Sequence, residues 1–283
     1  MEVSPISYRI ISELLEERTG QQLTEARRWR IGSALSGIFR ERGISNTDQL
    51  VCLLALPGET QLATQIVESL LNNESYFLRD RAMFDLLVRE ILPEIAEKRG
   101  DSRRISIWSA GCSTGQEALS LAMLFREQKE RWKNWKIDIL ATDLSRKAIQ
   151  TAKRGVYTQF EVQRGLTIGQ MLNFFEETEG GWKASDVLKD MVRYEVHNIH
   201  EPLHPGRNFD LVLCRNVLLY FSADTRRKVF QRLDSAMHED GWLMLGAGET
   251  VVGQTELFQP AKGQQGLYRK TNASAPVLPR VVN

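Results

Sequence analysis

A loop of small residues is the first feature of this sequence that could do chemistry. It runs Ala110-Gly-Cys-Ser-Thr-Gly115, between a β-rich run at 105–109 and a predicted helix at 116–130. Small residues at the carboxyl end of a parallel strand let a ligand approach the backbone, here at Gly111. The loop is not G-x-G-x-x-G and lacks the G-K-S or G-K-T ending of a phosphate-binding loop, which argues against dinucleotides and nucleoside triphosphates. The alternative interpretation is a tight strand-to-helix turn without a ligand.

Two carboxylates, Asp143 and Glu117, could complete a cofactor site around this loop. Asp143 ends the β-rich run at 137–142, where a carboxylate can accept both ribose hydroxyls of an adenosine; it could instead cap the following helix. Glu117 could meet an ammonium group, or could be an exposed carboxylate in the first turn of a helix. S-adenosylmethionine carries ribose, adenine and an ammonium group without phosphate, so these residues fit it better than they fit a nucleotide.

The histidines and cysteines do not form the pattern of a metal site. The three clustered histidines lie across a strand end and a proline-containing loop, and no carboxylate pair completes them; they are His197, His200 and His204. The three cysteines are widely spaced among small or apolar neighbours, which predicts buried, reduced thiols rather than disulfides or zinc ligands; they are Cys52, Cys112 and Cys214. We therefore expect no metal.

The elements that must position these residues fall into two parts. Residues 1–72 have apolar side chains at helical spacing and predict an all-helical N-terminal domain. Residues 96–270 alternate between strands and helices, which predicts a doubly wound parallel sheet covered by helices. The strands are expected at 105–109, 137–142, 192–196, 209–214, 242–246 and 266–269, and the helices at 116–130, 145–153 and 223–238.

Three further segments interrupt or flank this α/β domain. Within 157–191 the alternation breaks, and the runs at 171–175 and 182–184 around Gly180-Gly181 predict a hairpin in an inserted β-subdomain. Residues 73–95 are expected to be a linker that contributes to the cofactor site. The tail at 271–283 has little to bury and is expected to be disordered.

Composition and charge limit the partners. The 283 residues carry a formal net charge of +1, so the whole molecule has no electrostatic attraction to nucleic acid or membranes. The longest apolar run, 51–56, is far too short to span a bilayer, and the N-terminus does not resemble a signal peptide. We expect a cytoplasmic monomer that binds no nucleic acid and does not insert into membranes.

Several segments together resemble one family. Asn73-Glu-Ser-Tyr-Phe-Leu-Arg79 resembles the NETxFFR segment, and Trp108-Ser-Ala-Gly-Cys-Ser-Thr-Gly-Gln-Glu117 the CSTGEE segment, of the chemotaxis receptor methyltransferases, the CheR family. The similarity continues in the same order through 141–143, 164–166, 197–199 and 209–221. It implies an all-α N-terminal domain followed by an α/β, class I (Rossmann-like) methyltransferase domain with a small inserted β-subdomain.

The resemblance also implies the activity and its residues. The reaction would transfer a methyl group from S-adenosylmethionine to glutamate carboxylates on the cytoplasmic coiled coil of chemoreceptors. Because a glutamate carboxylate is already ionised at neutral pH, the enzyme mainly has to position it, and the residues expected nearest the methyl group are Arg79 and Tyr220. The implied cofactor contacts are Asn73, Ser75, Arg79, Glu117 and Asp143, with Asn198 and Ile199 near the adenine and Asn216 and Val217 beside the methionine part.

This sequence departs from the family pattern at three places. Ser75 stands for a Thr, Leu78 for a Phe, and Gln116-Glu-Ala118 for Glu-Glu-Pro. Ser75 keeps a hydroxyl and Leu78 keeps apolar bulk. None of the changes removes an expected ligand, so we expect activity; a non-catalytic module that binds the cofactor, or an enzyme for another carboxylate or a nucleic acid, is the alternative.

A basic segment is the candidate surface for the receptor. The helical stretch expected at 18–42 holds six arginines against two glutamates, a charge that attracts a glutamate-rich methylation helix. The alternative is an ordinary solvated helix face. The residues expected to bind the substrate are Arg27, Arg28, Arg30 and Arg215. The short hairpin at 175–182 favours recognition of the receptor without a peptide tether.

Overall fold

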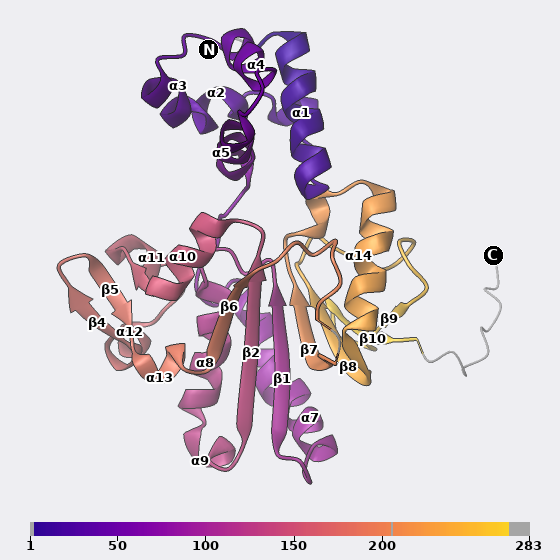
Figure 1. Ribbon diagram of the computed structural model, residues 1–283. Coiled ribbons are helices and arrows are strands. Elements are labelled where there is room, and N and C mark those ends of the chain that lie inside the picture. The colour runs from indigo at the N-terminus through magenta and orange to yellow at the C-terminus, as the bar shows by residue number, and fades with distance from the viewer. Residues whose placement is uncertain (1–2, 205, 272–283) are drawn as a thin grey trace.

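The computed structural model describes residues 3–204 and 206–271, which form a small helical domain placed above a larger α/β domain (Figure 1). The N-terminal part is helical in its described residues, as predicted. Its elements are α1 (Pro5–Thr19), η1 (Glu25–Arg27), α2 (Arg30–Ala34), α3 (Ser36–Arg42), α4 (Thr47–Leu54) and α5 (Thr60–Leu70).

The helical domain has its own core and a break that the sequence prediction missed. Ile11 of α1, Ile31 of α2 and Leu62 of α5 are fully buried in one apolar cluster. The helical stretch expected at 18–42 is interrupted: α1 ends at Thr19, Gly20 follows with a left-handed φ of 72°, and the chain then forms three short helices. A side chain at Gly20 would also collide with His200 of the α/β domain, so this break is where the two domains meet.

The α/β domain is built on one seven-stranded sheet of order β6-β2-β1-β7-β8-β10-β9. The first five strands in that order pair in parallel, and β10 pairs antiparallel with both β8 and β9. After β1 the strands β2 and β6 are added on one side of the sheet, and β7 and the later strands are added on the other side of β1. This reversal of strand order beside β1 is the topological switch point, where α/β folds bind ligands. The strands are β1 (Arg104–Ala110), β2 (Lys136–Asp143), β6 (Val192–Val196), β7 (Phe209–Cys214), β8 (Met237–Leu245), β9 (Phe258–Pro260) and β10 (Leu267–Lys270).

Helices cover both faces of this sheet (Figure 1). Alternate residues of a strand point to opposite faces: Ile107 packs in one cluster with Leu119 of α8, and Trp108 in the other with Phe230 of α14. The predicted doubly wound sheet is therefore confirmed. The helical elements of this domain are α6 (Arg81–Leu86), η2 (Leu87–Ile91), α7 (Leu92–Lys98), α8 (Gln116–Glu127), α9 (Lys129–Trp132), α10 (Arg146–Arg154), α13 (Asp186–Lys189), η3 (Leu218–Tyr220) and α14 (Ala223–Ser235).

Residues 73–95, expected to be a linker, belong instead to the α/β domain from α6 onward. The apolar side chains Phe84, Leu87 and Ile91 recur at helical spacing and are buried in the same cluster as α8 and the sheet. The π-helical turn η2 ends two residues before Pro93, which has no N–H to donate to the preceding turn. Only residues 73–80 form no regular helix or strand, so the predicted linker is limited to this segment.

The inserted segment is a small domain of helices and strands beyond β6 (Figure 1). Its sheet has the order β3-β5-β4, so the predicted β-subdomain is present, but residues 171–174 are helical rather than the first strand of the hairpin. Thr167 and Gln170 form a capping box that starts this helix, a signal that the sequence prediction missed. The elements are β3 (Val156–Tyr157), α11 (Gln159–Gln163), α12 (Ile168–Phe174), β4 (Phe175–Thr178) and β5 (Gly181–Ala184).

Several smaller predictions are also corrected. The helix expected at 223–238 ends at Ser235, and the next strand starts at Met237 rather than at 242, because Met237 pairs with Phe209 of β7. Cys52 is exposed, whereas Cys112 and Cys214 are buried, and all three thiols are free. The predicted disordered tail lies outside the described residues apart from Thr271. Among the described helices, none is long and apolar enough to cross a membrane.

Candidate functional site

A cavity of about 920 Å³, counting its open mouth, lies where the carboxyl ends of β1, β2, β6 and β7 face the helical domain. The structure brings all ten candidate cofactor residues to its wall, together with Tyr220 and Arg215. The helical domain adds lining residues that the sequence prediction did not include: Thr19, Gln21, Leu71 and Asn72.

The β1–α8 loop forms the floor of this cavity through close backbone contacts. The N–H groups of Gly111 and Cys112 both donate to the Thr142 carbonyl, at 2.8 and 2.9 Å. Gly111 has φ of 84°, and a Cβ there would lie 2.4 Å from Val217 Cγ2. A larger residue at 111 would therefore both strain the loop and push the β7 turn away from it.

Asp143 accepts two backbone hydrogen bonds at the end of β2. Its carboxylate oxygens accept from Ser113 N at 2.8 Å and from Ser145 N at 2.9 Å. Burial raises the pKa of Asp143, and these N–H bonds oppose that rise. The residue that caps α10 is Ser145, so the alternative role of Asp143 as helix cap is not what the structure shows. A carboxylate has about four acceptor positions, which leaves Asp143 able to accept ligand hydroxyls.

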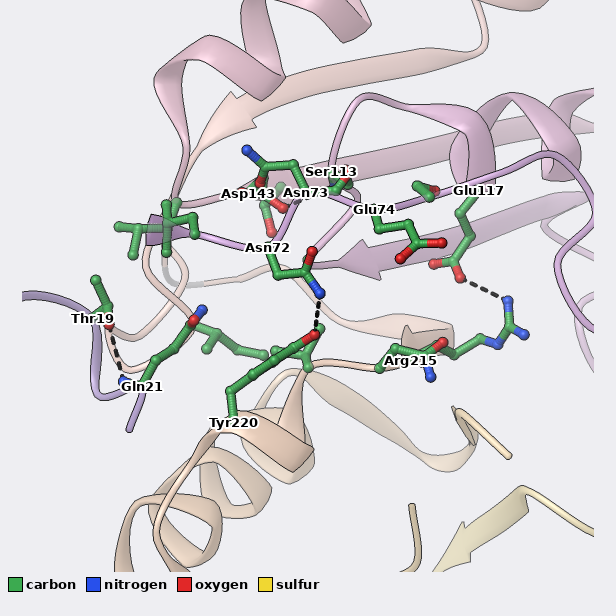
Figure 2. A pocket seen from close by; sticks show the side chains of 18 of the residues that line it. Thr19, Gln21, Asn72, Asn73, Glu74, Ser113, Glu117, Asp143, Arg215 and Tyr220 are labelled. Carbon is green, nitrogen blue, oxygen red and sulfur yellow. Dashed lines mark hydrogen bonds and ion pairs between the residues drawn. The ribbon is translucent and has the colours of Figure 1, made fainter. Parts of the chain in front are cut away.

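Glu117 and Arg215 form a partly buried ion pair on the wall opposite Asp143 (Figure 2). Arg215 donates to Glu117 at 3.0 Å, to Asp80 at 2.6 Å and to the Arg79 carbonyl at 2.7 Å. Ser109 Oγ donates to the other Glu117 oxygen at 2.8 Å. Only 1% of the Arg215 side chain is exposed, so its charge is already used within the protein, in contrast to the direct substrate contact expected from the sequence. We assign Arg215 the task of holding Glu117 and Arg79 in place.

Backbone strain is concentrated around the cavity. Five described non-glycine residues have positive φ. Four of them line the cavity or sit beside Arg79 in sequence: Leu78, Asp80, Ser113 and Asn216. Such conformations cost about 1–3 kcal/mol each and persist only where surrounding contacts enforce them. The Arg79 guanidinium lies 5.4 Å from the ring of Tyr76, so the strained turn presents this arginine next to an aromatic wall.

Glu249 is a site residue that the sequence prediction missed. Its two carboxylate oxygens accept from the backbone N–H groups of Asn216, Val217, Leu218 and Gly246 at 2.7–2.9 Å. These bonds fix the turn that follows β7 and carries Asn216, Val217 and Tyr220 into the cavity. A single glutamate after Gly246-Ala-Gly248 forms no motif by itself, and its role depends on β7 and β8 ending side by side.

The family of the chain follows from its similarity to known proteins. Residues 73–267 match the family model described as CheR methyltransferase, SAM binding domain. The chain belongs to the CheR methyltransferase family. It is 31% identical over 271 residues to a chemotaxis protein methyltransferase of Vibrio anguillarum, covering 95% of this chain and 98% of the relative. It is 30% identical over 277 residues to chemotaxis protein methyltransferase 1 of Pseudomonas aeruginosa, covering 95% and 99%.

The cavity of this CheR methyltransferase fits S-adenosylmethionine, the cofactor of its family. Asp143 offers acceptors for hydroxyls, Glu117 a negative charge for an ammonium group, and Ile199 an apolar surface for a base. The arginines of the wall are Arg79 and Arg215, and Arg215 is already paired. This composition suits a cofactor without phosphates. Which atom of the cofactor each residue contacts stays a prediction.

The three arginines expected on the receptor surface of the CheR chain lie outside the cavity wall and differ in their surroundings. The Arg27 guanidinium lies 4.8 Å from the ring centroid of Tyr220. Arg28 pairs with Glu25 at 2.8 Å and lies over the ring of Tyr8. Arg30 makes no ion pair with the described residues. Among those residues no group of three or more metal-binding side chains gathers.

Proposed function

We propose that this chain is a cytoplasmic protein-glutamate O-methyltransferase that forms methyl esters on the glutamate side chains of chemoreceptors. The observation that carries the proposal is the meeting of Asp143, Glu117, Arg79 and Tyr220 around one cavity at the switch point of the sheet. The names of its relatives, chemotaxis protein methyltransferases, supply the substrate class.

Different residues of the cavity wall would contact different parts of the cofactor. Asp143 would accept the ribose hydroxyls and Glu117 the ammonium group, while Asn198 and Ile199 would lie at the adenine and Asn216 with Val217 at the methionine part. Asn73 and Ser75 would close the site from the 73–80 segment. S-adenosylmethionine supplies an electrophilic methyl group when bound. Glu117 keeps its orientation because Ser109 and Arg215 hold both of its oxygens.

Arg79 and Tyr220 would position the substrate carboxylate. A guanidinium can hold a carboxylate through two parallel hydrogen bonds, and such orientation of reacting groups can contribute several kcal/mol. Methyl transfer removes the negative charge of the carboxylate, so a cation that only stabilises the bound carboxylate would slow the reaction. Arg79 would therefore serve by orientation more than by charge, and Tyr220 would supply a hydroxyl from the wall of the same cavity.

A transfer assay tests the proposal. The purified protein is incubated with cofactor labelled in the methyl group and with membranes that contain chemoreceptors. We expect base-labile label on a receptor band, which identifies a carboxyl ester. Label that resists base, or label absent from the receptor despite cofactor binding, would contradict the proposal. In the same assay Arg79→Ala should lose most of the transfer, whereas full transfer with unchanged cofactor affinity would exclude Arg79 from the site.

The same assay also tests the candidate receptor surface, through charge-reversal variants. Arg30→Glu should raise the receptor KM and leave the dissociation constant of the cofactor unchanged, because Arg30 lies outside the cavity wall. Lys129→Glu makes the same change of charge on α9, at the end of the sheet away from the helical domain (Figure 1). An equal rise in KM for both variants would show that only net charge matters.

A further inference from the structure

We infer that the N-terminal helical domain completes the catalytic site, with Asn72 and Arg27 positioning the side chain of Tyr220 so that its hydroxyl can donate to the substrate carboxylate. This inference rests on the proposed function, because it gives the Tyr220 hydroxyl a carboxylate to serve. Asn72 and Arg27 act through Tyr220 and are positioning residues, and neither needs to touch the substrate.

The contacts of Tyr220 with the helical domain extend from its backbone to its hydroxyl. The N–H of Gln22 donates to the Tyr220 carbonyl at 2.7 Å, and Gln21 forms an isolated antiparallel bridge with Phe221. Asn72 Nδ2 donates to the Tyr220 hydroxyl at 2.5 Å, as Figure 2 shows. The Arg27 guanidinium lies over the ring, 4.8 Å from its centroid. Thus the described hydrogen bond and cation contact of the Tyr220 side chain both come from the helical domain.

The α/β domain fixes the other side of the same turn. Glu249 holds the N–H groups of 216–218, which lead into the short helix η3 that ends at Tyr220. This clamp sets the backbone of the turn but does not reach the Tyr220 ring. The direction of the ring and of its hydroxyl therefore depends on the helical domain.

The direction of the Asn72 hydrogen bond determines what the hydroxyl can do. An amide NH2 group is only a donor, and a phenol has one proton and two acceptor positions. Because the Tyr220 oxygen accepts from Asn72, its own proton is left to donate elsewhere, and a substrate carboxylate in the cavity is an acceptor. A donor bonded to the phenol oxygen also strengthens the hydrogen bond that the phenol donates. The attraction between a cation and the face of an aromatic ring also favours the observed orientation of the ring.

Steady-state kinetics test this role. Asn72→Ala should lower kcat on the order of tenfold, the worth of one hydrogen bond, with the receptor KM and the cofactor dissociation constant unchanged. Asn72→Asp should lower kcat at least as much, because a carboxylate would accept the phenol proton and turn it away from the substrate. Gln22→Ala is the matched control at the same contact between the two domains and should leave kcat unchanged. The exposed Gln22 side chain donates to Glu16, and the hydrogen bond from the Gln22 backbone to Tyr220 remains in the variant.

A double-mutant cycle separates positioning from general packing. In a Tyr220→Phe background Asn72→Ala should cause no further loss of kcat, because the hydroxyl it acts on is gone. A tenfold loss in both backgrounds, or an unchanged kcat in Asn72→Ala alone, would overturn the inference.

A spectroscopic measurement keeps the inference independent of the receptor assay. In protein labelled with ¹³C at the Cζ of its six tyrosines, the resonance missing from Tyr220→Phe identifies Tyr220. We expect Asn72→Ala to shift this resonance and Gln22→Ala to leave it in place. No shift in Asn72→Ala would overturn the contact itself. If Asn72→Ala shifts this resonance but the wild-type protein forms no receptor ester, the proposed function is overturned and the Asn72–Tyr220 contact stands.

Discussion

At the scale of single residues, Asp143 illustrates how burial prepares a carboxylate for a ligand. Burial raises its pKa, and the Ser113 and Ser145 N–H groups partly offset this by stabilising the ionised form. The two hydrogen bonds thus fix the orientation of the carboxylate before the cofactor binds, so the side chain loses little conformational freedom on binding. Preorganisation of this kind reduces the entropy lost on binding.

Replacement of Asp143 tests its place in the cofactor site. Asp143→Ala removes the acceptor for the ribose hydroxyls, and hydrogen bonds to a charged group are worth about 1.5–3 kcal/mol. We expect the cofactor dissociation constant to rise by roughly 10- to 150-fold, measured by calorimetry. Asp138→Ala is the control on the same strand, since Asp138 pairs with Arg193 away from the cavity wall. Equal affinity in the wild type and Asp143→Ala would rule out the ribose contact.

The residues that sequence reasoning could place at the site share one property. Gly111, Asp143, Asn198 and Asn216 lie at or just after the ends of strands, and the carboxyl ends of parallel strands meet at one edge, so pattern alone brings them together. Asn72 and Glu249 were not predictable in this way. Each acts through a partner more than thirty residues away in sequence, namely Tyr220 and the 216–218 turn, and such partners become visible only when the domains have packed.

At the scale of elements, the sequence predicted the buried strands well. It did not predict those helix and strand boundaries that depend on contacts with residues distant in sequence. The strands at 192–196 and 209–214 lie where the sequence placed them, because runs of β-branched and apolar residues fix them locally. Met237 is a good helix former by type, and its pairing with Phe209 nevertheless places it in the strand. The residues of α6 to α7 form a helix rather than a linker because the sheet offers an apolar face to cover.

The turn after β7 is the element on which the site depends most. It holds Asn216 at φ of 59° and places Tyr220 in the cavity. The carboxylate of Glu249, which is 9% exposed as a residue, replaces the hydrogen bonds that a regular element would give these N–H groups. A buried N–H without an acceptor costs about 1–3 kcal/mol, so the turn cannot keep this shape without Glu249.

Glu249→Gln tests this dependence. The amide keeps one acceptor oxygen but turns an NH2 group toward backbone N–H groups, so we expect the free energy of unfolding to fall by roughly 2–4 kcal/mol in urea titrations. Cofactor affinity should fall as well, because Asn216 and Val217 move with the turn. Glu256→Gln removes the same charge from an exposed position nearby in sequence and should change neither quantity. A stable Glu249→Gln variant would show that the turn holds itself.

At the scale of the whole molecule, the site is shared between two domains with separate cores. The helical domain has its own apolar cluster, and two further clusters fill the faces of the sheet. Polar contacts join the two domains on both sides of the cavity: Asn72 with Tyr220 on one side, and Glu68 with Ser145 and the first N–H of α10 on the other. Movement of the helical domain would therefore change both the Tyr220 and the Asp143 side of the site.

The two buried thiols, Cys112 and Cys214, lie at the carboxyl ends of β1 and β7. Their ionisation therefore tests whether this edge of the sheet stays closed to solvent. Burial raises the pKa of both Cys112 and Cys214 well above the ordinary range, whereas an unfolded chain ionises its thiols near pH ~8.5. Above that pH the unfolded state binds fewer protons than the folded state, so the free energy of unfolding must fall as pH rises. The loss approaches about 1.4 kcal/mol per pH unit for each buried thiol. Below pH ~8.5 the two thiols contribute no such pH dependence.

Urea titrations between pH 7.5 and pH 9.5 measure this effect. We expect the Cys112→Ala, Cys214→Ala double variant to lose less stability over this range than the wild type, by about 1–3 kcal/mol. Cys52→Ala is the control, because the Cys52 side chain is exposed, and it should follow the wild type. The comparison uses the change with pH within each protein, so any constant cost of replacing a buried residue cancels. If the double variant lost as much stability as the wild type, both thiols would have to ionise inside the folded protein, and the carboxyl edge of the sheet would then open to solvent at the cofactor loop.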